Sequence, residues 1–167
     1  MNTVLIHIEA ILNSRPLTPM SLDPSDLIAL TPSHFLIGRT FTSLPNPEVK
    51  ETAALHTLSR YMRMQKLKTH FWNRFYMEYI TELQKRQKWQ RKGGQLNLGE
   101  MVLIKDDRLP PNQWRLGRVT HIYPGSDGVA RVADVITTSG SVRRAFNRLC
   151  PLPVMDQQNF VPGAATC

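Results

Sequence analysis

The sequence predicts an α+β protein in which an N-terminal helix and a long basic helical segment precede a small five-stranded β-barrel. Three features of the 167-residue chain lead to this prediction. Residues 52–89 contain neither proline nor glycine and space their apolar residues as a helix does. After Gly93-Gly94 the pattern changes to short apolar runs separated by turn residues. Residues 60–92 hold ten Lys or Arg against two Glu, a balance of +8 that equals the net charge of the whole chain.

The first predicted helix spans residues 3–13. Its apolar residues recur at the spacing of one helix face, which we expect to be buried: Val4, Leu5, Ile8, Ile11 and Leu12. Pro16 then ends the helix, because the residue before a proline disfavours helical backbone angles.

Six prolines between residues 15 and 47 predict an extended connection that wraps around the rest of the protein. Within it, residues 31–38 have the pattern of a single helical turn. Thr31 can cap the turn, Pro32 suits its first position, and Gly38 suits the position just after its end.

The stretch 52–89 is predicted to form one long helix, or two with a kink, that has an apolar side and a basic side. At about 100° per residue, an apolar arc of roughly 220° contains many large side chains: Met64, Leu67, Phe71, Trp72, Phe75, Tyr76, Tyr79, Ile80 and Leu83. The remaining arc contains Arg63, Lys66, Arg74 and Lys88. Glu78 and Glu82 precede Lys85 and Arg86 at helical spacing, which favours pairs within the helix over catalytic acids.

Five short runs follow, and five strands in about 60 residues have the dimensions of a small, strongly bent, SH3-like barrel. The predicted strands are Met101–Lys105, Arg115–Ile122, Val129–Ile136, Ser141–Phe146 and a stub at Leu149–Leu152. Turn residues rich in Pro, Gly, Asn, Asp and Ser separate them. The tail 154–167 is expected to be disordered.

No catalytic or metal-binding motif is recognisable in the sequence. There is no phosphate-binding or dinucleotide-binding glycine loop, no serine-nucleophile motif and no paired zinc histidines. Glu9, Asp23 and Asp26 could form a two-metal site only if the fold brought them together by coincidence. We therefore expect no enzyme activity, no metal, no cofactor and no small-molecule substrate. Because no apolar run is long enough, we expect no membrane span. Two cysteines without a disulfide framework fit a reducing compartment, so we expect an intracellular location, nuclear or cytoplasmic.

The density of positive charge favours a nucleic acid, most naturally DNA, as the partner. The candidate phosphate-binding residues lie on the helical segment and on one barrel strand: Arg63, Lys66, Arg74, Lys85, Arg86, Lys88, Arg91, Lys92, Arg143 and Arg144. The alternative is a protein-interaction or chromatin-tethering module in which the basic side is a solvated surface.

The aromatic residues admit two further interpretations. Those between residues 71 and 79 could stack on bases, although their common face favours core packing. Trp114, Tyr123 and Phe146 could form a cage for methylated lysine, although three aromatics in a small barrel are more commonly its core.

Residues 8–19 (IEAILNSRPLTP) and 29–38 (ALTPSHFLIG) resemble the end of the integrase core in Pao-type (BEL) LTR retrotransposon polyproteins. The resemblance continues at 70–72 (HFW), 98–104 (LGEMVLI), 109–111 (LPP), 114–119 (WRLGRV), 123–128 (YPGSDG) and 149–153 (LCPLP). It therefore extends over nearly all of residues 4–153.

This resemblance implies four parts: 1–38, the terminal remnant of an RNase H-like integrase core; 39–92, a linker and the basic helical segment; 93–153, the SH3-like barrel; and 154–167, the tail. The family's catalytic triad of two Asp and one Glu would lie before residue 1, and Glu9 does not match the motif Glu. The chain is then expected to be a non-catalytic C-terminal integrase fragment that binds nucleic acid and supports DNA integration. The remainder of an integrase complex would be a second partner.

Overall fold

The structure, a computed structural model, describes residues 2–41, 59–90, 96–125 and 130–154; the side chains of residues 86–90 lie outside this description. The helices are α1 (Asn2–Asn13), α2 (Pro32–Ile37) and α3 (Arg60–Gln90). Two short strands, β1 (Thr18–Pro19) and β2 (Ala29–Leu30), pair with each other between α1 and α2. The predicted α+β class, with an N-terminal helix and a long helix before a five-stranded sheet, is confirmed.

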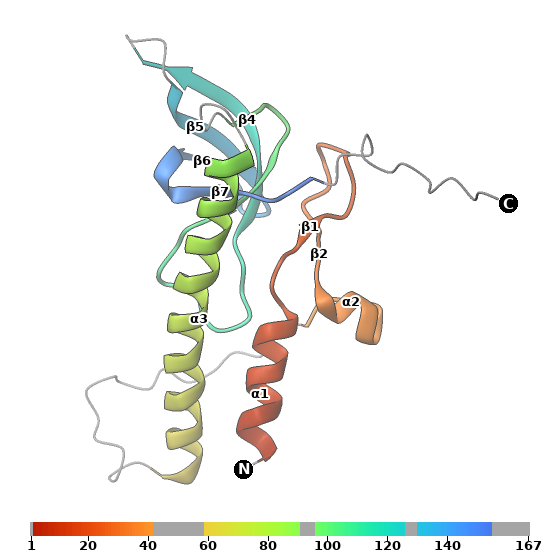
Figure 1. Cartoon of the computed structure of the whole chain (residues 1–167), viewed down its shortest axis with the longest axis vertical. Coiled ribbons are helices and arrows are strands. Elements are labelled where there is room, and N and C mark those ends of the chain that lie inside the picture. Colours follow the sequence, from red (N-terminus) through yellow and green to blue (C-terminus); the bar gives the residue numbers. More distant parts are fainter. Residues whose placement is uncertain (1, 42–58, 91–95, 126–129, 155–167) are drawn as a thin grey trace, which may run out of the picture.

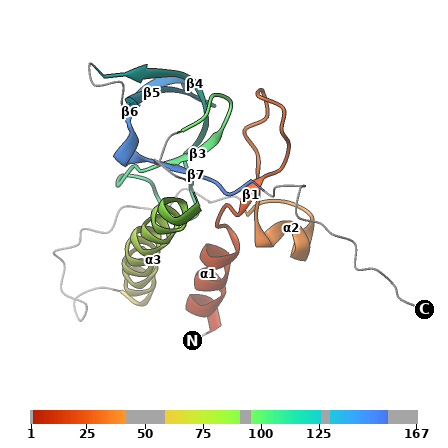
Figure 2. The same cartoon turned by 45° about the horizontal axis from the view of Figure 1, so that its top comes forward.

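The five-stranded sheet is antiparallel throughout. It consists of β3 (Met101–Ile104), β4 (Leu116–Pro124), β5 (Ala130–Thr137), β6 (Gly140–Ala145) and β7 (Leu149–Pro151), in the order β6-β5-β4-β3-β7. A 3-10 turn, η2 (Phe146–Arg148), separates β6 from β7. The sheet curls strongly (Figure 2), but no pairing joins β6 to β7 among the described residues. The expected SH3-like barrel is therefore not closed: β6 is one edge of the sheet and β7 is the other.

The predicted elements form, and the strands of the five-stranded sheet begin and end within one or two residues of their expected bounds. The turn at residues 31–38 forms as α2, where the Thr31 amide donates to His34 Nδ1 at 3.0 Å and Gly38 adopts a φ of 72°. The connection that we expected to be merely extended contains the β1–β2 pair. Phe146 begins η2 rather than ending β6, and residues 52–58 of the predicted long helix lie outside the described residues.

One side of α3 packs against the sheet. Its Trp72, Tyr76, Ile80 and Leu83 are buried with core residues that come mainly from β3 and from the chain around β7: Met101, Leu103, Cys150 and Leu152. Figure 1 shows the C-terminal part of α3 lying against the sheet and α1 running beside the lower part of α3. This packing confirms that the aromatic side of the helix is part of the core and leaves Trp72 and Tyr76 unable to stack on bases.

Trp114, in the long β3–β4 connection, contacts four aromatic side chains of α3. Its ring centroid lies 4.9 Å from that of Trp72 and 5.4 Å from that of Tyr76. Phe75 and Tyr79 approach it edge-on at 6.4 and 5.5 Å. Because such pairs add stability beyond the area they bury, this cluster fixes the rotation of α3 about its axis.

At the N-terminal ends of α1 and α3 the predicted apolar faces are only partly buried. Leu67, which we expected inside, is 49% exposed, whereas Lys68 on the same turn is buried, and burial lowers the pKa of its ammonium group. On α1 only Ile11 is fully buried, and Leu5 is 62% exposed. The reason is that α1 joins the core through its C-terminal half and leaves its first turns with little to pack against.

The N-terminal segment is tied to the sheet by partly buried hydrogen bonds. Arg118 of β4, 3% exposed, donates to the carbonyl oxygens of Ser21 at 2.6 Å, Asp26 at 2.8 Å and Gly99 at 2.9 Å. Trp114 Nε1 donates to Ser14 Oγ at 3.0 Å. These bonds satisfy groups that would otherwise be buried without partners, so residues 14–26 and the sheet are parts of one packed unit.

We predict that Trp114→Ala lowers the free energy of unfolding by about 3 kcal/mol, because it removes a large ring from the aromatic cluster and leaves a cavity. The control is Leu22→Ala, whose side chain is 76% exposed and which should change stability by less than about 0.5 kcal/mol. Urea denaturation of the two variants measures the difference. Equal stabilities would contradict the central position of Trp114.

We also predict that stability falls as the pH rises above about 9. Burial raises the pKa of the Cys150 thiol to about 11 and that of the Tyr76 phenol to about 12. Both groups therefore keep their protons in the folded chain at pH values where the unfolded chain releases them, so unfolding is favoured by higher pH. Denaturation midpoints at pH 7.5 and 10.5 test this. The fall should be smaller in Cys150→Ala, and a midpoint that does not change with pH would contradict it.

Candidate nucleic-acid interface

Several of the cations that were predicted to bind phosphate lie on α3, on the side away from the core. Arg63, Arg74 and Lys85 are exposed, and Lys66 is half-buried. The buried Trp72, Tyr76 and Leu83 occupy the opposite side. The helix therefore presents a row of cations to solvent along several turns, as the periodicity predicted.

Two of these cations have acidic neighbours on the same helix. Arg74 pairs with Glu78 at 2.9 Å, and Lys85 pairs with Glu82 at 3.2 Å. The hydrogen bond from Arg74 to Glu78 raises the pKa of the guanidinium. Exposed pairs of this kind contribute little, so a phosphate can compete with the carboxylate for the cation. The spacing of the charges predicted the pair of Glu82 with Lys85, whereas Glu78 pairs with the preceding Arg74 rather than with Lys85 or Arg86.

Four predicted residues lie at or beyond the end of the described helix. Arg86 and Lys88 are on α3, but their side chains are outside the description. Arg91 and Lys92 lie outside the described residues altogether.

The two predicted arginines of β6 differ in their surroundings. Arg143 is held by Asp134, with Nε donating to Oδ1 at 2.7 Å and Nη2 donating to Oδ2 at 3.0 Å. Its guanidinium also lies over the Tyr123 ring at 4.3 Å, and its hydrogen bond holds the pKa of Asp134 down at about 2. Arg143 is therefore occupied within the sheet surface, whereas Arg144 only donates to the neighbouring Arg143 carbonyl oxygen, at 3.0 Å.

The aromatic cage that we considered does not form. Trp114 belongs to the aromatic cluster on α3, whereas Phe146 packs against a separate hydrophobic cluster of the sheet that includes Val119, Val135 and Leu149. Tyr123 lies on the surface with Arg143 and Asp134. The three rings thus have separate surroundings.

A basic hollow of about 280 Å³ lies where the end of β3 meets the turn after β6. We call this site the basic hollow; it is lined by Lys105, Asp106, Asp107, Arg108, Arg144 and Arg148. The Lys105 amide donates to the Arg148 carbonyl oxygen at 2.8 Å, which extends the β3–β7 pairing and brings the two segments together. Of the six residues only Arg144 was predicted, because the others are isolated charges whose proximity depends on strand pairing.

The two carboxylates of the basic hollow differ in their ion pairs. Asp106 is bound by Arg108 at 3.1 Å and by Arg115 at 3.0 Å, and the hydrogen bond from Arg108 lowers the pKa of Asp106. Asp107 contacts Arg148 at 3.4 Å, with both side chains at least half exposed. Within the described part of the chain, no ion pair involves Lys105 or Arg144. Four cations against two carboxylates leave the basic hollow positive.

The basic hollow lies close to α3. Gln84 Nε2 donates to the Asn147 carbonyl oxygen in η2 at 3.2 Å. At about 100° per residue, Gln84 lies on the flank of α3 between the buried Ile80 and the exposed Lys85. The exposed side of α3 therefore continues past η2 toward the basic hollow.

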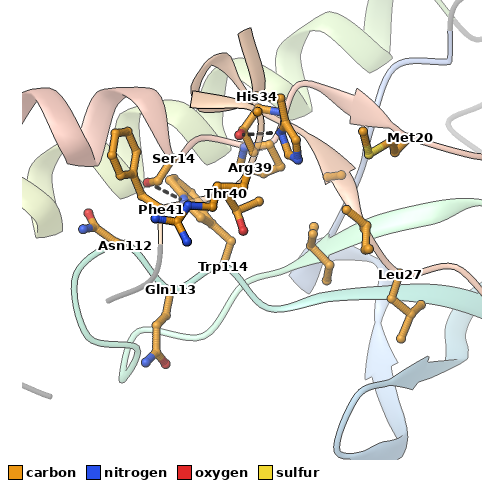
Figure 3. A pocket seen from close by; sticks show the side chains of 16 residues that line it. Ser14, Met20, Leu27, His34, Arg39, Thr40, Phe41, Asn112, Gln113 and Trp114 are labelled. Carbon is orange, nitrogen blue, oxygen red and sulfur yellow. Dashed lines mark hydrogen bonds between the residues drawn. The ribbon is translucent and has the colours of Figure 1, made fainter. Parts of the chain in front are cut away.

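A larger cavity than the basic hollow lies elsewhere and is mainly apolar. It measures about 750 Å³ and lies between the N-terminal segment and the β3–β4 connection. In Figure 3, Met20 and Leu27 lie at one end of it and Phe41, Asn112 and Trp114 at the other. Arg39 is its one Lys or Arg among the described residues. Its lining suits an apolar group better than a polyanion.

The described residues offer no cluster of metal ligands. They include no group of three or more His, Cys, Asp or Glu that could hold a metal ion. None of the helices in the described ranges has the length and apolarity that crossing a membrane requires.

The fold is a long basic helix packed by its aromatic side on a curled antiparallel sheet. Residues 59–152, which hold α3 and the whole sheet, match the model of DUF5641, a family of unknown function, and the chain belongs to this family. No curated protein and no solved structure matches the chain.

Proposed function

We propose that this chain is a non-catalytic C-terminal part of a Pao-type (BEL) retrotransposon integrase and that it binds nucleic acid through α3 in support of DNA integration. The observation that carries the proposal is the exposed row of cations on α3. The aromatic side of α3 is packed on the sheet, and Arg63, Arg74 and Lys85 on the other side are exposed to solvent. The resemblance of residues 4–153 supports the retrotransposon origin.

The chemistry of the proposed contact is electrostatic. Cations that neutralise backbone phosphates release condensed counterions, so affinity falls steeply with salt and depends little on base sequence. The surface pairs of Arg74 and Lys85 with Glu78 and Glu82 can open at small cost when a phosphate approaches. The chain would then hold DNA while the catalytic acids of the integrase lie elsewhere.

We predict that the full chain binds a short DNA duplex with log Kd rising linearly with log salt, by about 0.9 for each phosphate contact. Arg74→Gln/Lys85→Gln should lower this slope by about two and weaken binding at low salt about tenfold. Arg39→Glu is the matched control, because it removes the same two units of charge from the exposed end of α2. Fluorescence anisotropy over a salt series measures both quantities. Absence of binding at low salt, or a salt-independent affinity, would rule the proposal out.

A second candidate is a protein-interaction module without a direct nucleic-acid role, and a specific observation favours it. Large apolar side chains are exposed on α1 and α2: Leu5, Ile6, Phe35, Leu36 and Ile37. The resemblance places these helices at the end of an RNase H-like core, so the partner would be the preceding part of such a core.

We predict that, if this second candidate is right, Leu5→Ser/Phe35→Ser abolishes co-purification with a separately expressed integrase core from the same type of element. DNA affinity should be unchanged, because both side chains are uncharged and already exposed, so their replacement removes no cation. Unaltered co-purification of the variant would exclude the apolar surface as the docking site.

A further inference from the structure

We propose that the basic hollow formed by Lys105, Arg108, Arg144 and Arg148 is a binding site for a backbone phosphate of nucleic acid. This inference rests on the proposed nucleic-acid binding and adds to it a second contact point, on the sheet rather than on α3. The site is built by the fold, since residues 105–108 follow β3 and residues 144–148 span the end of β6 and η2.

The shape and the donors of the basic hollow suit a phosphate. Arginine guanidinium groups offer several N–H donors in a planar fork that matches phosphate oxygens, and lysine adds a compact charge. Lys105 and Arg144 are held half-buried at the site and are engaged in no ion pair within the described ranges. A phosphate that enters therefore finds two cations whose charge is not already neutralised.

The two carboxylates of the basic hollow differ in how strongly they would compete with a phosphate. Asp106 is bound on both oxygens, by Arg108 and Arg115, and acts as a fixed part of the wall. Asp107 is more than half exposed, and among the described residues its ion pair is with Arg148, at 3.4 Å. Asp107 therefore competes with the ligand for Arg148, and its removal should strengthen phosphate binding.

The position of the basic hollow relative to α3 allows one nucleic acid to reach both. The hydrogen bond between Gln84 and Asn147 brings η2 to the flank of α3 that borders its exposed side. A duplex lying along Arg74 and Lys85 would pass η2, where Arg148 and Arg144 line the hollow. The phosphate backbone is a continuous ligand that can bridge two such sites, which a single small anion cannot do.

The experiment uses the full chain, a fluorescein-labelled DNA duplex and two matched pairs of variants. Lys105→Gln/Arg144→Gln should weaken binding at low salt about tenfold and lower the salt slope by about two, relative to Arg39→Glu with the same net charge. Asp107→Asn should tighten binding about threefold, whereas Glu9→Gln, which removes one exposed carboxylate from α1, should change it less than about 1.5-fold. Thermal denaturation of each variant confirms that it is folded.

A gain in affinity from Asp107→Asn supports the phosphate site, because a change in a residue with a merely structural role would not tighten DNA binding. If the wild-type chain binds DNA and Arg74→Gln/Lys85→Gln weakens it, but both hollow variants behave like their controls, the basic hollow is not a phosphate site and the proposed function stands. If the wild-type chain does not bind the duplex at low salt, the proposed function fails and this inference fails with it.

Discussion

Trp114 packs against Trp72, Phe75 and Tyr79 of α3, and this contact sets which side of the helix faces solvent. The Trp72 indole also donates to the Leu109 carbonyl oxygen at 3.1 Å, and the Asp106 amide donates to the Tyr76 hydroxyl at 2.9 Å. The β3–β4 connection thus runs along the helix and is bound to it at several levels. Because the aromatic side of α3 is held against the core in this way, the cations on the other side face solvent.

The same packing brings together chain segments that are far apart in sequence. The connection that carries Trp114 also carries Asp106 and Arg108, so its attachment to α3 holds one wall of the basic hollow. The other wall follows from the β3–β7 pairing, which places Arg148 beside Lys105. The helix and the hollow are therefore consequences of a single arrangement of α3 on the sheet. Substitutions in the aromatic cluster should disturb both together.

Local patterns were sufficient to predict the three helices, the strands of the five-stranded sheet and the basic side of α3, but not the β1–β2 pair or η2. Residues 31–38 contain their own cap, proline and terminal glycine, and the strands are separated by turn residues, so both signals are local. Sequence patterns could not predict that β6 and β7 do not pair with each other in the described part of the chain. They also could not predict that Leu67 is exposed while Lys68 is buried, or that Arg143 is held by Asp134. Each of these depends on contacts across the fold. For the same reason, the basic hollow became apparent only when strand pairing placed residues 105–108 beside residues 144–148.

Lysine acetylation, read out residue by residue by mass spectrometry with and without saturating duplex DNA, tests most directly whether the solvent side of α3 is the nucleic-acid surface. Lys66 and Lys85 lie on the solvent side or its border, whereas Lys68 is buried toward the core. DNA should slow the acetylation of Lys66 and Lys85 several-fold and leave the low reactivity of Lys68 unchanged. Equal acetylation of Lys66 and Lys85 in the free and the DNA-saturated chain would contradict the account.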